Sequence, residues 1–245
     1  MIWQFVDSGV MDGFKNMAYD LALLDNVQDE PVLRFYGWNP PALSIGRFQR
    51  LDDLNVDFIK KMGFDLVRRP SGGRAVLHYD ELTYSVILPA FMSNKGVLES
   101  YLEISKALLN GLKGLNLNCQ ISRDKRNYTR NSACFAVTSV YEISVDGKKL
   151  VGSAQVRRNG KILQHGSIPL KLHLKEYSNS FKNSEYLDKI LEDSMTSIEE
   201  HVKITMDELK EAILAGFMET LEIEFIPLKI QVDFQKYLKE VKVWD

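Results

Sequence analysis

The sequence has few of the residues from which metal sites and disulfide frameworks are built. Two of its 245 residues are cysteine and four are histidine, and they form no CxxC or HExxH pattern. The phosphate-binding patterns GxxxxGK[ST] and GxGxxG are also missing. Structural zinc, zinc-dependent hydrolysis and the common nucleotide-binding loops therefore have no support in the sequence. We expect no metal and no cofactor.

Long apolar runs and a strong excess of one charge are missing as well. No stretch approaches the ~18 consecutive apolar residues of a membrane-spanning helix. The N-terminus has no basic segment ahead of an apolar run, so we expect no signal peptide and a cytoplasmic location. Lysine and arginine number 31 against 33 acidic residues, a formal net charge of -2. That balance disfavours a nucleic-acid-binding module, because such modules are usually strongly basic.

Hydrophobic periodicity predicts alternating strands and helices. Strands are expected at 2–6, 32–38, 42–46, 64–69, 82–88 and 222–226, and helices at 12–27, 53–62, 97–113, 205–221 and 231–241. We expect strands 32–38 and 42–46 to form a hairpin. Asp-Gly and Asn-Gly turns at 146–147 and 159–160 predict a three-stranded meander over 134–169. We predict one α+β domain over 1–245, with a mixed or antiparallel sheet flanked by helices and a mainly helical part from about 180.

Residues 68–78 (RRPSGGRAVLH) combine glycines with arginines directly after a predicted strand. Gly72 and Gly73 let the backbone approach a ligand closely, and successive N–H groups there can form an anion-binding nest. Arginine binds carboxylate or phosphate through two parallel hydrogen bonds. The segment indicates either a carboxylate- or phosphate-binding loop or a glycine-rich hairpin with solvated arginines.

A lysine and a histidine in the meander are further candidates. Lys149 and Leu150 point in opposite directions along a strand, so only one of them faces the core. An inward Lys149 needs a partner, because an unpaired buried ammonium is costly; otherwise it is a surface lysine beside a turn. His165 in the third strand has two possible roles. It could act in the chemistry, by donating a hydrogen bond or moving a proton, or it could be purely structural.

The two cysteines differ in their surroundings. Cys134 follows a basic stretch at 123–130, and neighbouring positive charge can lower a thiol pKa below ~8.5 and make a better nucleophile. The alternative is a small buried side chain. Cys119 lies in a short apolar stretch that we expect to be a strand, and we assign it the buried role.

Taken together, these segments resemble the biotin/lipoate protein ligase superfamily. The resemblance covers roughly residues 1–175 and is carried by RFYGWNPPALSIGRFQ (34–49), RRPSGGRAVLH (68–78), LTYSVIL (82–88), DGKKLVGSAQ (146–155) and LQHGSI (163–168). It implies a single α+β catalytic domain of the class II biotin/lipoate ligase type. It also implies an enzyme that moves a lipoyl, octanoyl or biotinyl group onto one lysine of a small carrier domain.

Within that superfamily two chemistries compete. Lipoate ligases activate free lipoate with ATP, whereas octanoyltransferases take the acyl group from acyl carrier protein through an enzyme cysteine. Arg74 stands where ligases usually carry a third glycine, and the Cys134-Phe135…Tyr141-Glu142 segment resembles the cysteine-dependent octanoyltransferases. We therefore predict octanoyl transfer to a lipoyl-domain protein, such as glycine cleavage H protein or the E2 of a 2-oxoacid dehydrogenase. An ATP-dependent lipoate ligase and a non-catalytic acyl or lipoyl-domain binder remain the alternatives.

The resemblance also implies roles for individual residues. Cys134 would attack the thioester, and Lys149 would lie along the acyl carbonyl. The substrate-binding positions would be Arg69, Ser71, Gly72, Gly73, Arg74, Val76, His78, Gly152, Ser153, Ala154, His165 and Gly166, with an apolar tunnel near Val76 and Val151.

Two further expectations concern the loop histidine and the partners. The family usually carries Asp directly after the loop histidine, but here Tyr79 follows His78 and Asp80 comes next. The acid that orients the loop is therefore left open. Basic residues at 123–130 and 157–158 would steer an acidic acyl carrier protein. We expect no nucleic-acid and no membrane partner.

Overall fold

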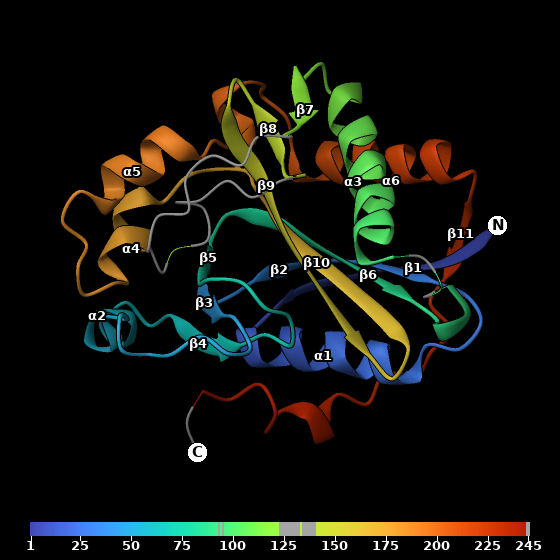
Figure 1. The fold of residues 1–245 in the computed structure, drawn as a ribbon, viewed down its shortest axis with the longest axis horizontal. Helices are drawn as coiled ribbons and strands as arrows, with labels where there is room; N and C mark the ends of the chain where they lie inside the picture. The colour runs from blue at the N-terminus through green and yellow to red at the C-terminus, as the bar shows by residue number, and fades with distance from the viewer. Residues whose placement is uncertain (93, 95, 123–132, 134–140, 244–245) are drawn as a thin grey trace.

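The computed structural model describes residues 1–245 except 93, 95, 123–132, 134–140 and 244–245. Within these residues, an eight-stranded mixed sheet runs in the order β11-β1-β2-β6-β10-β9-β8-β7, and a three-stranded sheet runs in the order β4-β3-β5 (Figure 1). The main sheet contains β1 (Ile2–Met11), β2 (Val32–Trp38), β6 (Glu81–Leu88), β7 (Cys119–Ile121), β8 (Ile143–Val145), β9 (Lys148–Arg158), β10 (Lys161–Pro169) and β11 (Glu224–Pro227). The small sheet contains β3 (Ala42–Ile45), β4 (Asp65–Arg68) and β5 (Val76–His78). The predicted α+β fold is confirmed.

Helices cover both faces of the main sheet. They are α1 (Gly13–Asn26), α2 (Val56–Lys61), α3 (Val97–Gly114), α4 (Leu174–Asn179), α5 (Leu187–Ser194) and α6 (Met206–Leu221), with short 3-10 helices at Ala90–Met92, Ile198–Glu200 and Gln235–Tyr237. Successive residues of β2 point to opposite faces of the main sheet. Leu33 joins the core under α3 and α6, while Val32 packs against α1. One face of the sheet therefore belongs to α3 and α6, and the other to α1.

The helix pair α3 and α6 packs closely because small residues meet at its crossing. A Cβ atom built on Gly216 would lie 2.3 Å from the backbone nitrogen of Gly111. A capping box starts α6: the Thr205 side chain accepts from the Glu208 backbone N–H, and the Glu208 carboxylate accepts from the Thr205 N–H. This pair seals the face of the sheet that lies away from the small sheet.

The described part of the meander forms as its turns predict. β8 pairs antiparallel with β9, and β9 with β10. Asp146 and Gly147 have φ of 50° and 81°, and Asn159 and Gly160 have φ of 51° and 74°. Both turns thus need two successive residues that tolerate positive φ, as Asp-Gly and Asn-Gly do. The first part of the meander, 134–140, lies outside the described residues.

The predicted hairpin of 32–38 and 42–46 is wrong. β3 leaves the main sheet and pairs with β4 in parallel and β5 antiparallel. The reason is that both edges of β2 are occupied, one by β1 and the other by β6. The displaced β3 carries the small sheet over the face of the main sheet where α1 also lies.

The predicted helix at 231–241 is also wrong. Only Gln235–Tyr237 forms a short 3-10 turn there. The apolar side chains of Tyr237 and Val241 pack against Met17 of α1 and Val67 of β4, so this segment docks as an irregular strap. Among the described residues, no helix combines the length and the apolar character needed to cross a lipid bilayer.

Candidate active site

A cavity of about 270 Å³ lies between the main sheet and the small sheet. β2, β6, β10 and β9 contribute residues from the main sheet, while β3, β5 and the loop 69–74 contribute the opposite wall. The predicted site residues that line it are Arg69, Gly73, Arg74, Val76, His78, Lys149, Gly152, Ser153, Ala154, His165 and Gly166. In the part of the chain that the structure describes, no group of three or more His, Cys, Asp or Glu side chains is placed to hold a metal ion.

Three of the predicted residues do not line the cavity. Ser71 is fully buried behind the wall and Gly72 is exposed on the loop. The Val151 side chain packs into the core with α3 and α6, whereas its strand, β9, lines the cavity through Gly152 and Ala154. Cys134 lies outside the described residues, and its proposed role as nucleophile stays a prediction.

Strand register aligns residues on the cavity side of the main sheet in two rows across four strands. The first row consists of Arg34, Ser85, His165 and Ala154. The second row consists of Tyr36, Thr83, Ser167 and Gly152. In both rows the side chains are large on β2 and small on β9. The sheet therefore leaves open space beside β9, and the side chains fill that space toward β2.

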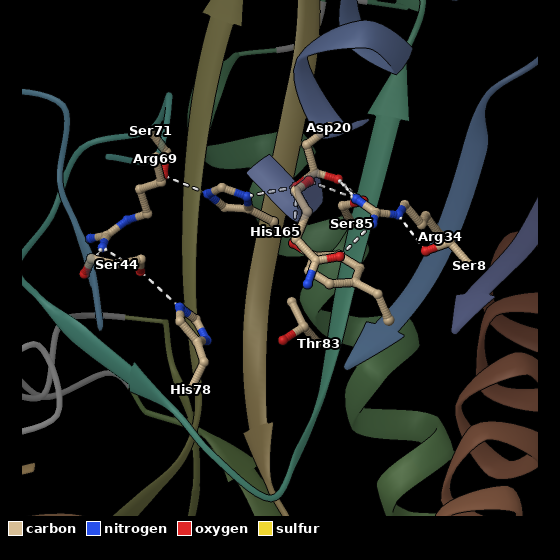
Figure 2. A network of polar contacts seen from close by, with 12 residues as sticks. Ser8, Asp20, Arg34, Ser44, Arg69, Ser71, His78, Thr83, Ser85 and His165 are labelled. Atoms are coloured by element: carbon tan, nitrogen blue, oxygen red, sulfur yellow. Dashed lines mark hydrogen bonds and ion pairs between the residues drawn. The ribbon is translucent and has the colours of Figure 1, made fainter. Parts of the chain in front are cut away.

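His165 stands at the centre of a buried chain of hydrogen bonds (Figure 2). Its Nε2 lies 2.6 Å from Ser71 Oγ, and its Nδ1 lies 3.1 Å from Asp20 Oδ2. Asp20 Oδ1 in turn accepts from Arg34 Nη1 at 2.8 Å. Because an ionised carboxylate only accepts, Nδ1 of His165 carries the proton and Nε2 accepts from the Ser71 hydroxyl. The chain links the glycine loop to α1 and β2.

The charges of this chain are fixed by burial and by Arg34. Burial raises the pKa of Asp20, but Arg34, His165 and Ser85 outweigh it, so the pKa lies below its ordinary value. Burial lowers the pKa of His165 more strongly than Asp20 raises it, so the ring is neutral at pH 7. Since both folded-state pKa values are lowered, both groups stabilise the fold above their unfolded-state pKa, and this stabilisation is lost as the pH falls.

A second chain of the same kind runs through His78. Its Nε2 lies 2.7 Å from Ser44 Oγ and its Nδ1 lies 2.7 Å from Glu81 Oε1. The hydroxyls of Thr83 and Ser167 donate to the same carboxylate. The ring of Trp38 stacks on His78 with centroids 4.0 Å apart. The imidazole is therefore held in position on the cavity wall from three sides.

Glu81 is the acid that orients the loop histidine, His78. It lies three residues after His78 and contacts that ring directly. Asp80 instead lies 2.7 Å from His173, whose ring stacks on Tyr79 at 3.7 Å. The acid that holds the loop histidine in this chain is thus Glu81, three residues after it.

Lys149 points into the cavity wall and is fully buried. Its Nζ lies 2.6 Å from Glu142 Oε1, which provides the partner that the sequence required. The pairing of β8 with β9 is irregular here: Ile143 lies opposite Val151, but Ser144 lies opposite Lys149. Leu150 is the extra residue of this bulge and packs into the α3–α6 core. The bulge turns Lys149 onto the cavity face, as bulges beside active sites often do.

Arg69 holds the glycine loop from within. Its Nη2 donates to the carbonyl oxygens of Gly72 at 2.9 Å and Arg74 at 2.6 Å, and its Nη1 donates to the Ser44 carbonyl at 3.0 Å. Gly73 has a φ of 92°, which favours glycine. The glycine loop is thus held in one backbone conformation by hydrogen bonds from the guanidinium of Arg69.

Arg68 binds the neighbouring loop. Its Nη1 donates to the carbonyl oxygens of Gly46 at 2.9 Å and Gln49 at 3.0 Å. A Cβ atom on Gly46 would lie 2.0 Å from the Gly73 carbonyl oxygen, so the two loops touch backbone to backbone. The 46–49 loop therefore supports the rim of the cavity.

The predicted basic steering patch is only partly described. Residues 123–130 lie outside the described residues. Arg158 lies 3.1 Å from Glu240 and 3.4 Å from Asp25, so nearby carboxylates neutralise its charge. Arg157 donates to Ser100 Oγ at 3.3 Å. That Arg157 and Arg158 steer an acidic carrier stays a prediction.

Asp20, Arg34 and Glu81 are site residues that sequence reasoning missed. Asp20 lies on the apolar stripe of α1 between Met17 and Leu24, and Arg34 interrupts an apolar strand. A charged residue at a position that periodicity marks as buried is a usable signal, because a buried charge is kept only with a partner. No local pattern, however, identifies which partner it has.

Replacing Asp20 with asparagine is expected to lower the free energy of unfolding at pH 7 by about 3–5 kcal/mol. The change leaves the Arg34 guanidinium buried without its carboxylate. Urea denaturation measures the loss. Asp52→Asn is the control, because its pair with Arg50 is exposed on the surface and breaking it costs under about 1 kcal/mol. Equal small losses in both variants would show that neutral partners suffice for Arg34.

Fold and site define an α+β domain whose cavity lies between a glycine loop and a buried lysine. Residues 12–218 match the lipoyl protein ligase A/B catalytic domain, and the chain belongs to this family. It is 41% identical to Octanoyltransferase LipM of Staphylococcus epidermidis, over 98% of this chain and 94% of that one. It is 42% identical to Octanoyltransferase LipM of Staphylococcus aureus, over 93% and 90%.

A solved structure shares the fold. The bipartite lipoate protein ligase from Thermoplasma acidophilum superposes with a TM-score of 0.80 at 26% identity, covering 98% of this chain and 91% of that one. The sequence resemblance to the superfamily is confirmed. The family match extends beyond residue 175, where the resemblance read from the motifs stops, to residue 218.

Proposed function

We propose that the protein is an octanoyltransferase. It moves an octanoyl group from octanoyl-acyl carrier protein to a specific lysine of a lipoyl-domain protein, such as glycine cleavage H protein or the E2 of a 2-oxoacid dehydrogenase. The observation that carries the proposal is the 41% identity to an octanoyltransferase over 98% of the chain. The buried Lys149 in the cavity wall is consistent with acyl-transfer chemistry. The reaction belongs in the cytoplasm.

The proposed reaction has two transfers. The thiolate of Cys134 attacks the thioester carbonyl, a new S–C bond forms, and the carrier's thiol leaves. The acceptor lysine then attacks the acyl-enzyme, an amide bond forms, and the Cys134 thiolate leaves. Ala133, next to Cys134 in sequence, is fully buried and bridges to Ala75, between the cavity residues Arg74 and Val76. This contact supports a nucleophile at the cavity.

Lys149 stabilises the oxyanion in both steps. A buried positive charge aimed at the carbonyl oxygen acts where water does not screen it, and such electrostatic stabilisation usually contributes most to the acceleration of acyl transfer. Glu142, at 2.6 Å, fixes the ammonium in place. A nearby ammonium also lowers a thiol pKa, which favours the Cys134 thiolate.

The acceptor lysine must lose a proton before it attacks, since its reference pKa is ~10.4. His78 and His165 both line the cavity, and each is anchored through Nδ1 by a carboxylate. That arrangement leaves Nε2 as the proton acceptor of each ring. Nε2 contacts a serine hydroxyl, Ser44 for His78 and Ser71 for His165, so a proton reaches the ring through that hydroxyl. We assign the proton transfer to this pair of histidines.

One observation favours a second function. The superposition on a lipoate protein ligase has a TM-score of 0.80, so the same cavity also suits an ATP-dependent lipoate ligase. Under that function Cys134 would be dispensable and Lys149 would remain essential.

The test supplies the wild-type protein and a lipoyl domain with either octanoyl-acyl carrier protein alone or free octanoate with ATP. Intact mass spectrometry of the lipoyl domain reports the product. We expect an octanoyl-sized gain with the carrier thioester and none with free octanoate. A gain that requires ATP would establish the ligase, and no gain in either reaction would leave a non-catalytic binder.

A further inference from the structure

The cavity runs across the strands of the main sheet, so the strand spacing measures its length. Lys149 and Gly152 line it from β9, and Tyr36 lines it from β2. In the order β2-β6-β10-β9, three strand spacings separate the two ends. At about 4.8 Å for each spacing, the strands that bound the cavity lie roughly 14 Å apart.

Tyr36 closes the β2 end as a fixed wall. Its hydroxyl donates to Asp20 Oδ2 at 3.0 Å, and the Arg34 guanidinium lies 3.9 Å from its ring centroid. The side chain is 2% exposed. Because Asp20 and Arg34 are themselves paired and buried, the ring cannot turn aside without breaking the network.

Met17 lies beside Tyr36 at the same end. The two side chains share one buried apolar cluster with Leu21 and Val67, and that cluster contains no residue of β9 or β10. Met17 also lines the cavity. An unbranched thioether fills irregular space and adapts when its neighbours change. Of the two residues at this end, Met17 is therefore the one whose size can be changed without removing a hydrogen bond.

We propose that Met17, packed against Tyr36, sets the length of the acyl chain that the enzyme accepts. The inference rests on the proposed function, since it takes the reacting carbonyl to lie beside Lys149. An extended chain of eight carbons has seven carbon–carbon bonds and spans about 8 Å at the ~1.2 Å per bond of an extended chain. Starting beside β9, it ends close to β6, two strand spacings away, and the Met17 and Tyr36 side chains occupy the remaining distance to β2.

The test compares acyl-acyl carrier proteins carrying six, eight, ten and twelve carbons as donors to a lipoyl domain. We expect Met17→Ala to raise the decanoyl-to-octanoyl ratio of kcat/KM tenfold or more, since each methylene contributes about 10–200-fold in a fitted apolar pocket. Met17→Phe is expected to shift preference toward hexanoyl by a similar factor. Met17→Leu, of nearly equal volume, should keep the wild-type ratio.

Leu21→Ala is the matched control. Leu21 lies one turn further along α1, is 2% exposed like Met17, and belongs to the same cluster, but it does not line the cavity. Its ratio should stay within twofold of wild type. Equal shifts in Met17→Ala and Leu21→Ala, or no shift in Met17→Ala and Met17→Phe, would overturn the proposal.

Binding separates this inference from the proposed function. Isothermal titration of octanoate and decanoate to wild type and Met17→Ala reports the cavity length without any transfer. Tighter decanoate binding by the variant in a protein that transfers nothing would retain the length limit and reject the transferase. Normal octanoyl transfer with unchanged chain preference would retain the transferase and reject the length limit. Should Met17→Ala not fold, Met17→Val provides the same comparison.

Discussion

The Cys134→Ala protein is expected to form no acyl-enzyme and to lose octanoyl transfer by about four orders of magnitude or more. Removing a covalent nucleophile eliminates the route that divides one difficult step into two easier ones. Intact mass measured after brief mixing with octanoyl-acyl carrier protein, without ATP, should show an octanoyl-sized gain in wild type and none in the variant. Under the ligase alternative the variant would keep full activity with ATP.

Cys119 provides the matched control for this experiment. It is 3% exposed in β7, and its Sγ donates to the Leu109 carbonyl at 3.9 Å. Burial raises the pKa of this thiol, so it is a poor nucleophile at neutral pH. Cys119→Ala should therefore keep the mass gain. A gain that persists in Cys134→Ala and disappears in Cys119→Ala would show that Cys119, and not Cys134, carries the acyl group.

Lys149→Met is expected to lower kcat for transfer by about 10²–10³-fold, the loss typical of removing one oxyanion donor. The same change leaves Glu142 without the ammonium at 2.6 Å, and breaking a buried pair costs ~3–5 kcal/mol. A loss of activity must therefore be separated from a loss of stability. Steady-state kinetics and thermal denaturation on the same preparations measure both.

Two further variants make that separation. Glu142→Gln combined with Lys149→Met replaces the pair with neutral groups, so it should recover most of the stability and none of the activity. Lys148→Met removes the adjacent lysine, whose Nζ donates to the Glu192 carbonyl at the surface at 2.7 Å, and should leave both properties unchanged. Recovery of transfer in the double variant would show that Lys149 acts only through stability.

The sequence predicts those parts of the site whose chemistry is concentrated in short segments. The glycine loop at 68–78 and the lysine at 149 stand out because their residue types are unusual beside a strand. Both meander turns are predictable for the same local reason. These short segments do not indicate the order of the strands in the sheet. The false hairpin of β2 with β3 followed from assuming that neighbours in sequence are neighbours in the sheet.

The neighbours that Arg34 and His165 have in the sheet depend on strand register. Arg34, Ser85 and His165 share one row only because β6 lies between β2 and β10. No feature of residues 34 or 85 alone indicates that they meet. The bulge at Leu150 cannot be predicted from the sequence either, since the alternation of side chains along a strand leaves open whether Lys149 or Leu150 faces the cavity. Register and bulges are set by the packing of the whole sheet.

The position of β11 has a consequence for how the chain is made. β1 pairs with β2 on one edge, but its other edge is covered by β11, which comes far later in the sequence at Glu224–Pro227. A nascent chain therefore carries an open strand edge until β11 has been translated. Unpaired edges are templates for aggregation, and pairing between distant segments is slow. Production of this protein should thus depend on how quickly β11 leaves the ribosome to complete the sheet.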